Sequence, residues 1–361
     1  VEAELVSFGI EREFEYLSHI TQANHLVPLP RRAFASADET HIRIWDFNGD
    51  IVKQTFPSNR RSMVCAMVHC PTFNALLTAE VDMTVKAYTT KTLQLMDTFY
   101  LEQLRVNEKE RLSGKISSLG FIKQHSSVLL GGESGLELWK ISKSTHRRAV
   151  SVGRLEYHLS FEKTRQICKE HVLRFIVDPT ESRVVVWGRR SFSIYDMEFS
   201  LLAEYMKPHA EPMRCACIRV VSLLETLLLT GGEDGAVNFW TIQGSIKSED
   251  RNGRTGRQFD DLQSTNDITT ASTAEAEVVS FVRLEYSFQG HTRPVEMVGF
   301  YHRMEQSVRQ RLCVSCGRDC KMRVWSLIQF SLVYALDLAS LDMKASIFPL
   351  ASHFFAVSAL H

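Results

Sequence analysis

The sequence predicts an all-β protein built from repeated four-stranded antiparallel units. Short apolar runs recur along the chain, as in NALLTAE and TLLLTGG, and each is followed by a segment that ends in an aromatic residue. Such runs, bounded by Gly or charged turns, are typical of strands that are buried on both faces. A unit that recurs in this way covers its exposed face with the next unit, so we expect one repeating body.

The strands are expected in the same order in every unit. The apolar runs are the second strands, and the third strands end at the aromatic residues Trp45, Tyr88, Trp139, Tyr195, Trp240 and Trp325. A fourth strand follows and alternates polar with apolar residues, as in DIVKQTF and FSLVYAL, which is typical of a half-solvated edge. The steps between aromatic ends range from 43 to 85 residues, so the longer units must contain loops.

Two units carry a complete set of polar residues before the final Trp. A hydroxyl residue stands ten positions before the Trp and an Asp six positions before it, with a His upstream. The two sets are His209, Thr230, Asp234 and Trp240, and His291, Ser315, Asp319 and Trp325. This pattern resembles the WD-repeat β-propeller family. The resemblance implies that each set is a structural hydrogen-bond chain, which runs from the Trp indole through the hydroxyl and the His to the Asp.

Strand-like segments at the two ends are expected to supply a last blade. ELVSFGI and REFEYLS lie at the start, and KASIFPL and HFFAVSAL lie at the finish. Because edge strands would otherwise stay unpaired, we predict a seven-bladed WD-repeat β-propeller of four-stranded blades over residues 1–361, with the last blade closed by both termini. The alternative is that the C-terminal pair opens a further propeller. The first residue is Val and the last residues are apolar, which indicates a piece of a longer chain.

A polar insert is predicted at residues 243–278, between the third and fourth strands of the fifth unit. It is rich in Ser and Thr and almost free of large apolar residues, so it cannot bury enough surface to offset its ordering entropy. We expect a mobile loop. Its hydroxyls are either phosphorylation sites or merely solvated.

The first four units depart from the complete polar pattern. In the second, Thr78 and Asp82 stand before Tyr88, but there is no suitable His. In the third, Leu129 replaces the hydroxyl residue. We therefore expect these four blades to rely more on packing than on polar networks. Residues 161–170 are expected to form a helical turn or two.

Composition and motifs exclude several functions. Lys and Arg total 42, as do Asp and Glu, so the chain has no global field to attract nucleic acid or an anionic membrane. No apolar run is long enough to cross a bilayer. The sequence lacks a Walker-type Gly-rich loop, GxSxG and HExxH, so we predict no enzyme activity, no catalytic residue, no small-molecule substrate and no cofactor.

Eight cysteines raise the question of a metal site. Cys313 and Cys316 lie three residues apart in a predicted strand and so point to opposite faces, and with Cys320 they still give only three ligands of the four that a structural zinc site needs. No metal site is predicted. Free thiols in this number suit a reducing compartment, so we expect a cytoplasmic protein, with a cytoskeletal or ciliary location as an alternative.

The function expected from these features is a non-catalytic protein–protein interaction scaffold within a larger multi-subunit assembly. The expected contact residues are five arginines in or beside loops on one face of the propeller: Arg189, Arg190, Arg214, Arg293 and Arg318. One alternative is a propeller that reads phosphoinositide, phosphopeptide or RNA through its basic loops. Another is a component of a ciliary, cytoskeletal or trafficking complex.

Overall fold

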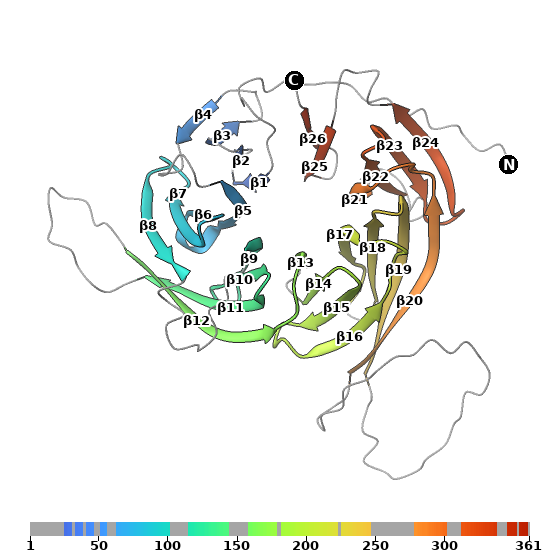
Figure 1. Ribbon diagram of the computed structural model, residues 1–361, viewed down its shortest axis with the longest axis horizontal. Coiled ribbons are helices and arrows are strands. Elements are labelled where there is room, and N and C mark those ends of the chain that lie inside the picture. Colours follow the sequence, from blue (N-terminus) through green and yellow to red (C-terminus); the bar gives the residue numbers. More distant parts are fainter. Residues whose placement is uncertain are drawn as a thin grey trace, which may run out of the picture.

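A ring of antiparallel sheets surrounds a central axis in the computed structural model of the protein (Figure 1). The structure describes residues 25–30, 33–38, 41–46, 51–55, 63–101, 115–143, 158–178, 182–222, 225–246, 278–301, 312–337, 345–351 and 354–359. All strand pairs in these residues join neighbours in the sequence, so each blade is a simple meander.

The first three blades occupy the N-terminal half of the chain. Blade 1 comprises β1 (His25–Leu29), β2 (Ala33–Ala37), β3 (Ile42–Asp46) and β4 (Ile51–Thr55). Blade 2 comprises β5 (Val64–Cys70), β6 (Ala75–Glu80), β7 (Thr84–Thr89) and β8 (Leu95–Tyr100), with the short 3-10 helix η1 (Pro71–Phe73) after β5. Blade 3 comprises β9 (Ile116–Ile122), β10 (Ser127–Gly132), β11 (Gly135–Lys143) and β12 (Leu159–Cys168).

Three further blades follow in the same order of strands. Blade 4 comprises β13 (Arg174–Val177), β14 (Arg183–Trp187), β15 (Ser191–Asp196) and β16 (Leu201–Met206). Blade 5 comprises β17 (Met213–Val220), β18 (Glu225–Gly232), β19 (Ala236–Ile246) and β20 (Val278–Gln289). Blade 6 comprises β21 (Val295–Tyr301), β22 (Leu312–Gly317), β23 (Lys321–Ser326) and β24 (Ser331–Asp337).

The number of complete blades differs from the expected seven. The described residues form six four-stranded sheets and one two-stranded sheet, made by β25 (Ala345–Ala351) and β26 (Phe354–Ala359). β25 contacts both β21 and β1, so this pair occupies the place between blade 6 and blade 1 (Figure 1). The N-terminal strands that were expected to complete this blade fall in residues 1–24, outside the described part of the chain.

The second strand of a blade is covered on both sides. Every residue of β6, β10, β14 and β22 is buried, as the continuous apolar runs predicted. The six aromatic ends all lie in third strands, and each is at most 8% exposed. By contrast β4 and β24 are mostly exposed, as expected for the outer edge of a blade. Stacked blades therefore supply the core.

Two expectations about local structure are wrong. Residues 161–170 were expected to be helical, but residues 159–168 form β12, which pairs with β11 through two register shifts. Leu159 and Phe161 are buried while Ser160 and Glu162 are exposed, because one side of an outer strand faces water. The insert at 243–278 is also shorter, since Gln243 pairs with Phe281 and Ile246 with Val278 in the β19–β20 ladder. Residues 247–277 lie outside the described part.

An aromatic stack joins blade 2 to blade 3. Phe161 on β12 packs against Trp139 on β11 and Phe99 on β8, with ring centroids 5.0 Å apart in both pairs. Phe161 is 4% exposed and Trp139 is fully buried. The stack therefore couples two neighbouring blades through one side chain.

We predict that Phe161→Ala lowers the free energy of unfolding by about 3–5 kcal/mol, because it removes a large buried ring from between two blades. Urea denaturation followed by circular dichroism measures this change. Tyr100→Ala on the adjacent outer strand is the control, since Tyr100 is 53% exposed and its loss should change stability by no more than about 0.5 kcal/mol. Equal effects from the two substitutions would contradict the prediction.

Candidate functional site

The four polar residues of blade 5 form a continuous hydrogen-bond chain. The indole Nε1 of Trp240 donates to Thr230 Oγ1 over 2.9 Å, and this hydroxyl lies 2.8 Å from His209 Nε2. His209 Nδ1 in turn lies 3.2 Å from Asp234 Oδ1. Asp234 also accepts hydrogen bonds from the backbone N–H groups of Ala210 and Ala236. The chain thus fixes a loop, a turn and two strands in one geometry.

Blade 6 repeats this arrangement and adds a cation. Trp325 Nε1 donates to Ser315 Oγ over 2.8 Å, Ser315 Oγ lies 2.8 Å from His291 Nε2, and His291 Nδ1 lies 2.9 Å from Asp319 Oδ1. Arg323 Nη1 also donates to Asp319 Oδ2 over 2.9 Å. The Arg323 guanidinium therefore neutralises part of the charge of the Asp319 carboxylate.

The pKa values in these chains follow from burial and hydrogen bonding. Burial lowers the pKa of His291, although Asp319 partly opposes this shift. Burial alone would raise the pKa of Asp319, but the bonds from His291 and Arg323 outweigh it and lower the pKa. His291 Nδ1 lies 2.9 Å from Asp319 Oδ1 and 2.7 Å from Arg323 Nη1, so the ring is held between a carboxylate and a cation.

The two hydroxyls of these chains are closed to solvent. Thr230 and Ser315 both have 0% exposure, and each already contacts an indole and an imidazole. A nucleophilic hydroxyl needs access to its substrate and a site for the developing oxyanion. These particular His, Asp and hydroxyl groups are therefore arranged for structural hydrogen bonding.

Blade 1 contains a polar network that the sequence analysis missed. Trp45 Nε1 donates to Ser36 Oγ over 2.7 Å, and Ser36 stands nine residues before Trp45 instead of ten. Asp38 accepts from the His41 backbone N–H over 2.5 Å and pairs with Arg43 at 3.4 Å. The expectation that the first four blades rely on packing more than on polar networks is wrong for this blade.

Blades 2 and 3 use buried ion pairs in place of the His. Lys86 Nζ lies 2.5 Å from Glu80 Oε2 in blade 2. In blade 3, Glu137 accepts from Trp139 Nε1 over 2.9 Å and pairs with Lys163 at 3.3 Å. The sequence does contain the signal: a charged residue stands two positions before the aromatic end, on a buried strand, and such a charge requires a partner.

The equivalent hydroxyl of blade 2, on Thr78, forms no hydrogen bond with a described residue. Thr78 stands ten residues before Tyr88, as Thr230 does before Trp240, and is also 0% exposed. Its Oγ1 and the Tyr88 hydroxyl both lack a hydrogen-bond partner among the described residues. The same residue type at equivalent positions is thus bonded in blade 5 and unbonded in blade 2.

The substitution Thr→Val at these two positions should have opposite effects. Thr230→Val leaves the indole of Trp240 and the imidazole of His209 without their shared partner, so we expect a loss of about 1–3 kcal/mol in the free energy of unfolding. Thr78→Val removes an unbonded buried hydroxyl and should be neutral or stabilising. Chemical denaturation of both variants tests this, and a similar loss in each would refute the distinction.

The five predicted arginines lie in or beside connections at one end of the strands. Arg189 and Arg190 stand between β14 and β15, Arg293 between β20 and β21, and Arg318 between β22 and β23; these four are exposed. Arg214 is half-buried in β17, next to the connection from β16. We call the surface formed by these five residues the arginine face.

Acidic residues that the sequence analysis missed neutralise part of the arginine face. Arg214 pairs with Glu296 at 2.9 Å and with Glu233 at 3.2 Å. Arg318 Nε lies 2.5 Å from the same Glu296 oxygen. Glu296 thus links blade 5 to blade 6. Their spacing along the chain, up to 82 residues, gives no local signal for these pairs.

The inner strands place a His close to a cationic residue. His25 on β1 lies with Nε2 3.1 Å from the Val64 carbonyl oxygen of β5. Burial, together with the positive charge of Arg174 at the start of β13, lowers the pKa of His25 from 6.5 to about 4. The neutral ring therefore donates to the Val64 carbonyl. Protonation of the ring would place a positive charge in this buried position, near the charge of Arg174.

This shift makes stability depend on pH. The unfolded chain protonates His25 near pH 6.5 and the folded chain only near pH 4, so the free energy of unfolding should fall as the pH is lowered through that window. The expected contribution is on the order of a few kcal/mol. His25→Gln keeps a donor for Val64 and should have a shallower pH profile in urea denaturation between these limits. Identical profiles would show that His25 does not titrate in this way.

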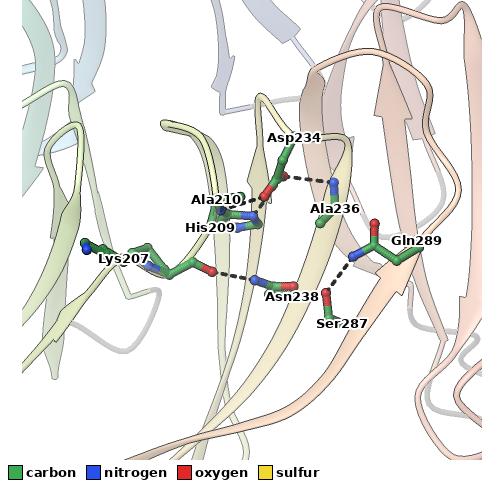
Figure 2. Close-up of a pocket in the computed structure, with 9 residues that line it drawn as sticks. Lys207, His209, Ala210, Asp234, Ala236, Asn238, Ser287 and Gln289 are labelled. Atoms are coloured by element: carbon green, nitrogen blue, oxygen red, sulfur yellow. Dashed lines mark hydrogen bonds and ion pairs between the residues drawn. The ribbon is translucent and has the colours of Figure 1, made fainter. Parts of the chain in front are cut away.

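An open pocket lies where the connection from blade 4 meets blade 5. It has a volume of about 380 Å³ and is shown in Figure 2. Its walls are the connection from β16 to β17 and one face of β19 and β20, with these lining residues: Lys207, Pro208, His209, Ala210, Asp234, Ala236, Asn238, Ser287 and Gln289. The pocket is adjacent to the blade 5 chain but reaches solvent.

The cysteines show no arrangement for metal binding. All eight are free, and the described residues contain no group of three His, Cys, Asp or Glu side chains that could hold a metal ion. Cys313 and Cys316 pack into different core clusters, which confirms that they point to opposite faces of β22. Burial raises the pKa of both thiols. Across the ranges that the structure describes, no helix has the length and hydropathy of a membrane span.

Comparisons with known proteins agree with the repeat and with the ring. Residues 283–326 match the family model described as WD domain, G-beta repeat; they run from within β20 to the end of β23. The crystal structure of the WD40 β-propeller domain of Doa1 is similar in fold, with a TM-score of 0.55, 13% sequence identity, and coverage of 95% of this chain and 90% of that chain. No curated protein matches the chain in sequence. The predicted resemblance to WD-repeat β-propellers is confirmed.

Proposed function

We propose that this protein is a non-catalytic interaction scaffold and that partner proteins dock on the arginine face. The observation that carries the proposal is the exposure of Arg189, Arg190, Arg293 and Arg318 on short connections of a rigid sheet framework. WD-repeat propellers generally serve as such scaffolds. Loops held by stiff blades lose little entropy on binding, and Arg is enriched among the residues that dominate interface energies.

The expected partner is an acidic protein surface. Arg189 and Arg190 form no ion pair with any described residue. The basic residue Lys207 lies beside them in space, because its backbone N–H donates to the Arg190 carbonyl over 2.6 Å. Charges that are not neutralised within the chain are available for a partner, and they increase association rates more than affinity. We propose a multi-subunit assembly in the cytoplasm as the setting. The eight free thiols support a reducing compartment.

The same cations support a second candidate function, the recognition of a phosphorylated ligand such as a phosphoinositide or a phosphopeptide. Guanidinium groups bind phosphate through two parallel hydrogen bonds, which suits the neighbouring Arg189 and Arg190. Binding to anionic vesicles or to oligonucleotides that weakens with salt would favour this function. If no such binding is found, the protein–protein scaffold is the function that is supported.

We further propose that residues 1–24 complete the blade begun by β25 and β26. The place of β25 between β21 and β1 supports this, because a two-stranded sheet leaves β26 with an open edge. A closed ring would hold blades 4, 5 and 6, which carry the arginine face, in a rigid frame.

Reversing the charges of the arginine face should remove its partners. We expect the combined Arg→Glu variant at positions 189, 190, 293 and 318 to lose at least about tenfold in affinity for partners captured by the intact protein, in line with the loss of several interface charges. Quantitative affinity capture and then titration with each purified partner measure this loss. Arg214 is left unchanged because it is the partner of Glu233 and, once Arg318 is replaced, the remaining partner of Glu296.

Arg283→Glu provides the control for net charge. Arg283 is on the outer strand β20, with a side chain that is 79% exposed, away from the connections that form the arginine face. This variant should retain every partner. If the four-residue variant also retains every partner, the arginine face does not bind them.

A further inference from the structure

We propose that the pocket between the β16–β17 connection and blade 5 binds an acidic segment of a partner protein. The proposal rests on the scaffold function, because the ligand is a peptide, but it concerns a different site, which adjoins the arginine face through the backbone hydrogen bond from Lys207 to Arg190. With a volume of about 380 Å³ the pocket lies at the lower end of the roughly 300–1,000 Å³ typical of ligand sites. It is large enough for a side chain and its adjoining peptide group.

The strand register builds one wall of this pocket. Ala236 on β19 pairs with Gln289 on β20, and Asn238 pairs with Ser287. Residues two apart on a strand share a face, as do directly paired residues of adjacent strands, so these four side chains lie on the same side of the sheet. The connection that contains Lys207 and Ala210 lines the same pocket (Figure 2).

Asn238 supplies an unused acceptor in the pocket wall. Its side chain is 5% exposed, and Nδ2 donates to the Pro208 carbonyl oxygen over 2.6 Å. A carbonyl can only accept, so the amide orientation is fixed and Oδ1 faces away from Pro208 (Figure 2). Among the described residues Oδ1 has no hydrogen-bond partner. A buried acceptor of this kind requires a donor, and a ligand N–H group would provide one.

Comparison with the other blades explains why the pocket is open. Asn238 stands two residues before Trp240, and the same position holds Arg43, Lys86 and Arg323 in blades 1, 2 and 6. Each of those long cations pairs with an acid of its own blade. Asn238 is shorter and uncharged, and Asp234 is already bonded to His209 and two backbone N–H groups. Blade 5 therefore has a shorter, uncharged side chain at the position that a paired cation occupies in those three blades.

The charges around the pocket favour a ligand that is a donor at one end and an anion at the other. Lys207 is exposed at the rim and forms no ion pair within the described residues, so it can bind a carboxylate. Deeper in the pocket, Asn238 Oδ1 and the Asp234 carboxylate would repel an anion. A phosphate alone does not fit this pattern. A peptide does, with an Asp or Glu side chain at Lys207 and a backbone N–H at Asn238 Oδ1.

The test compares the wild-type protein with Asn238→Arg. This substitution places the residue of blades 1 and 6 in blade 5, so it should fill the pocket and pair with Asp234 without unfolding the protein. Phage-displayed random heptapeptides are selected on the wild-type protein with counter-selection on Asn238→Arg. We expect enriched peptides that contain Asp or Glu and that lose about tenfold in affinity for Asn238→Arg, because the substituted side chain fills the pocket and removes the amide acceptor.

A second variant keeps the test valid if Asn238→Arg does not fold. Lys207→Glu changes an exposed residue and should reduce binding of the same peptides by a similar factor, whereas the matched control Lys321→Glu, on an exposed lysine of blade 6, should leave it unchanged. The proposal is overturned if no enriched peptide depends on Asn238 or Lys207, or if the enriched peptides lack acidic residues.

The result also separates this site from the arginine face. Loss of whole partners in the four-arginine variant, with no peptide that depends on Asn238, would reject the pocket and leave the scaffold function standing. Peptides that depend on the pocket, with every partner retained by the four-arginine variant, would reject the arginine face and support the pocket.

Discussion

Each blade of this propeller is covered by its neighbours on both faces, and this double burial constrains everything else in the structure. A second strand such as β6 or β22 has no side from which to reach water, so most of its residues are apolar or small, and the charged Glu80 of β6 is paired with Lys86. Any polar group on the adjacent third strand must find its partner inside the blade, because an unpaired one would be costly. The outer strands, the connections and the partly exposed inner strands therefore offer most of the surface on which polar groups can meet a ligand.

The third strands show how differently this constraint can be met. Blades 5 and 6 use an indole, a hydroxyl, an imidazole and a carboxylate, while blade 2 uses the Lys86–Glu80 ion pair and blade 3 centres on Glu137. A buried ion pair is not a strong source of stability, since desolvation offsets most of its attraction. Its main effect in these blades is to define one side-chain arrangement. The blades thus share a geometry more closely than they share residues.

The sequence predicted the repeat, the strand order and the two complete chains because these depend on short-range spacing. Runs such as LLLTGG and the Trp at its fixed distance are visible within one blade. The ion pair of Glu296 with Arg214 was missed because it joins two blades, and the pair of Glu296 with Arg318 was missed because its residues lie 22 positions apart on different segments of blade 6. The β12 strand was predicted to be helical because its polar residues do not alternate with apolar ones after Phe161, so the sequence lacks the period of two that indicates a strand. Ser36 was missed because blade 1 shortens the spacing by one residue.

The candidate site in the pocket of blade 5 becomes apparent only when equivalent positions of the blades are compared. An Asn in a strand is not by itself a sign of a site. At the same position of other blades, however, Arg43, Lys86 and Arg323 each pair with an acidic residue, and Asn238 does not. Lys207 reaches the site through the connection from the preceding blade, so no local window contains both walls. The sequence signal for the proposed site is therefore the replacement, in blade 5, of the cation that three other blades have at this position.

The buried thiols have a consequence for how motions of the ring could be observed. Cys70 lies in blade 2, Cys215 in blade 5, and Cys313 and Cys316 in blade 6, all buried and all with a pKa raised by burial. Such thiols react with alkylating reagents only when their blade opens and the thiolate forms in water. The chain therefore contains native reporters of the local opening of three blades, and their separate labelling rates would reveal whether the ring yields as one unit or blade by blade.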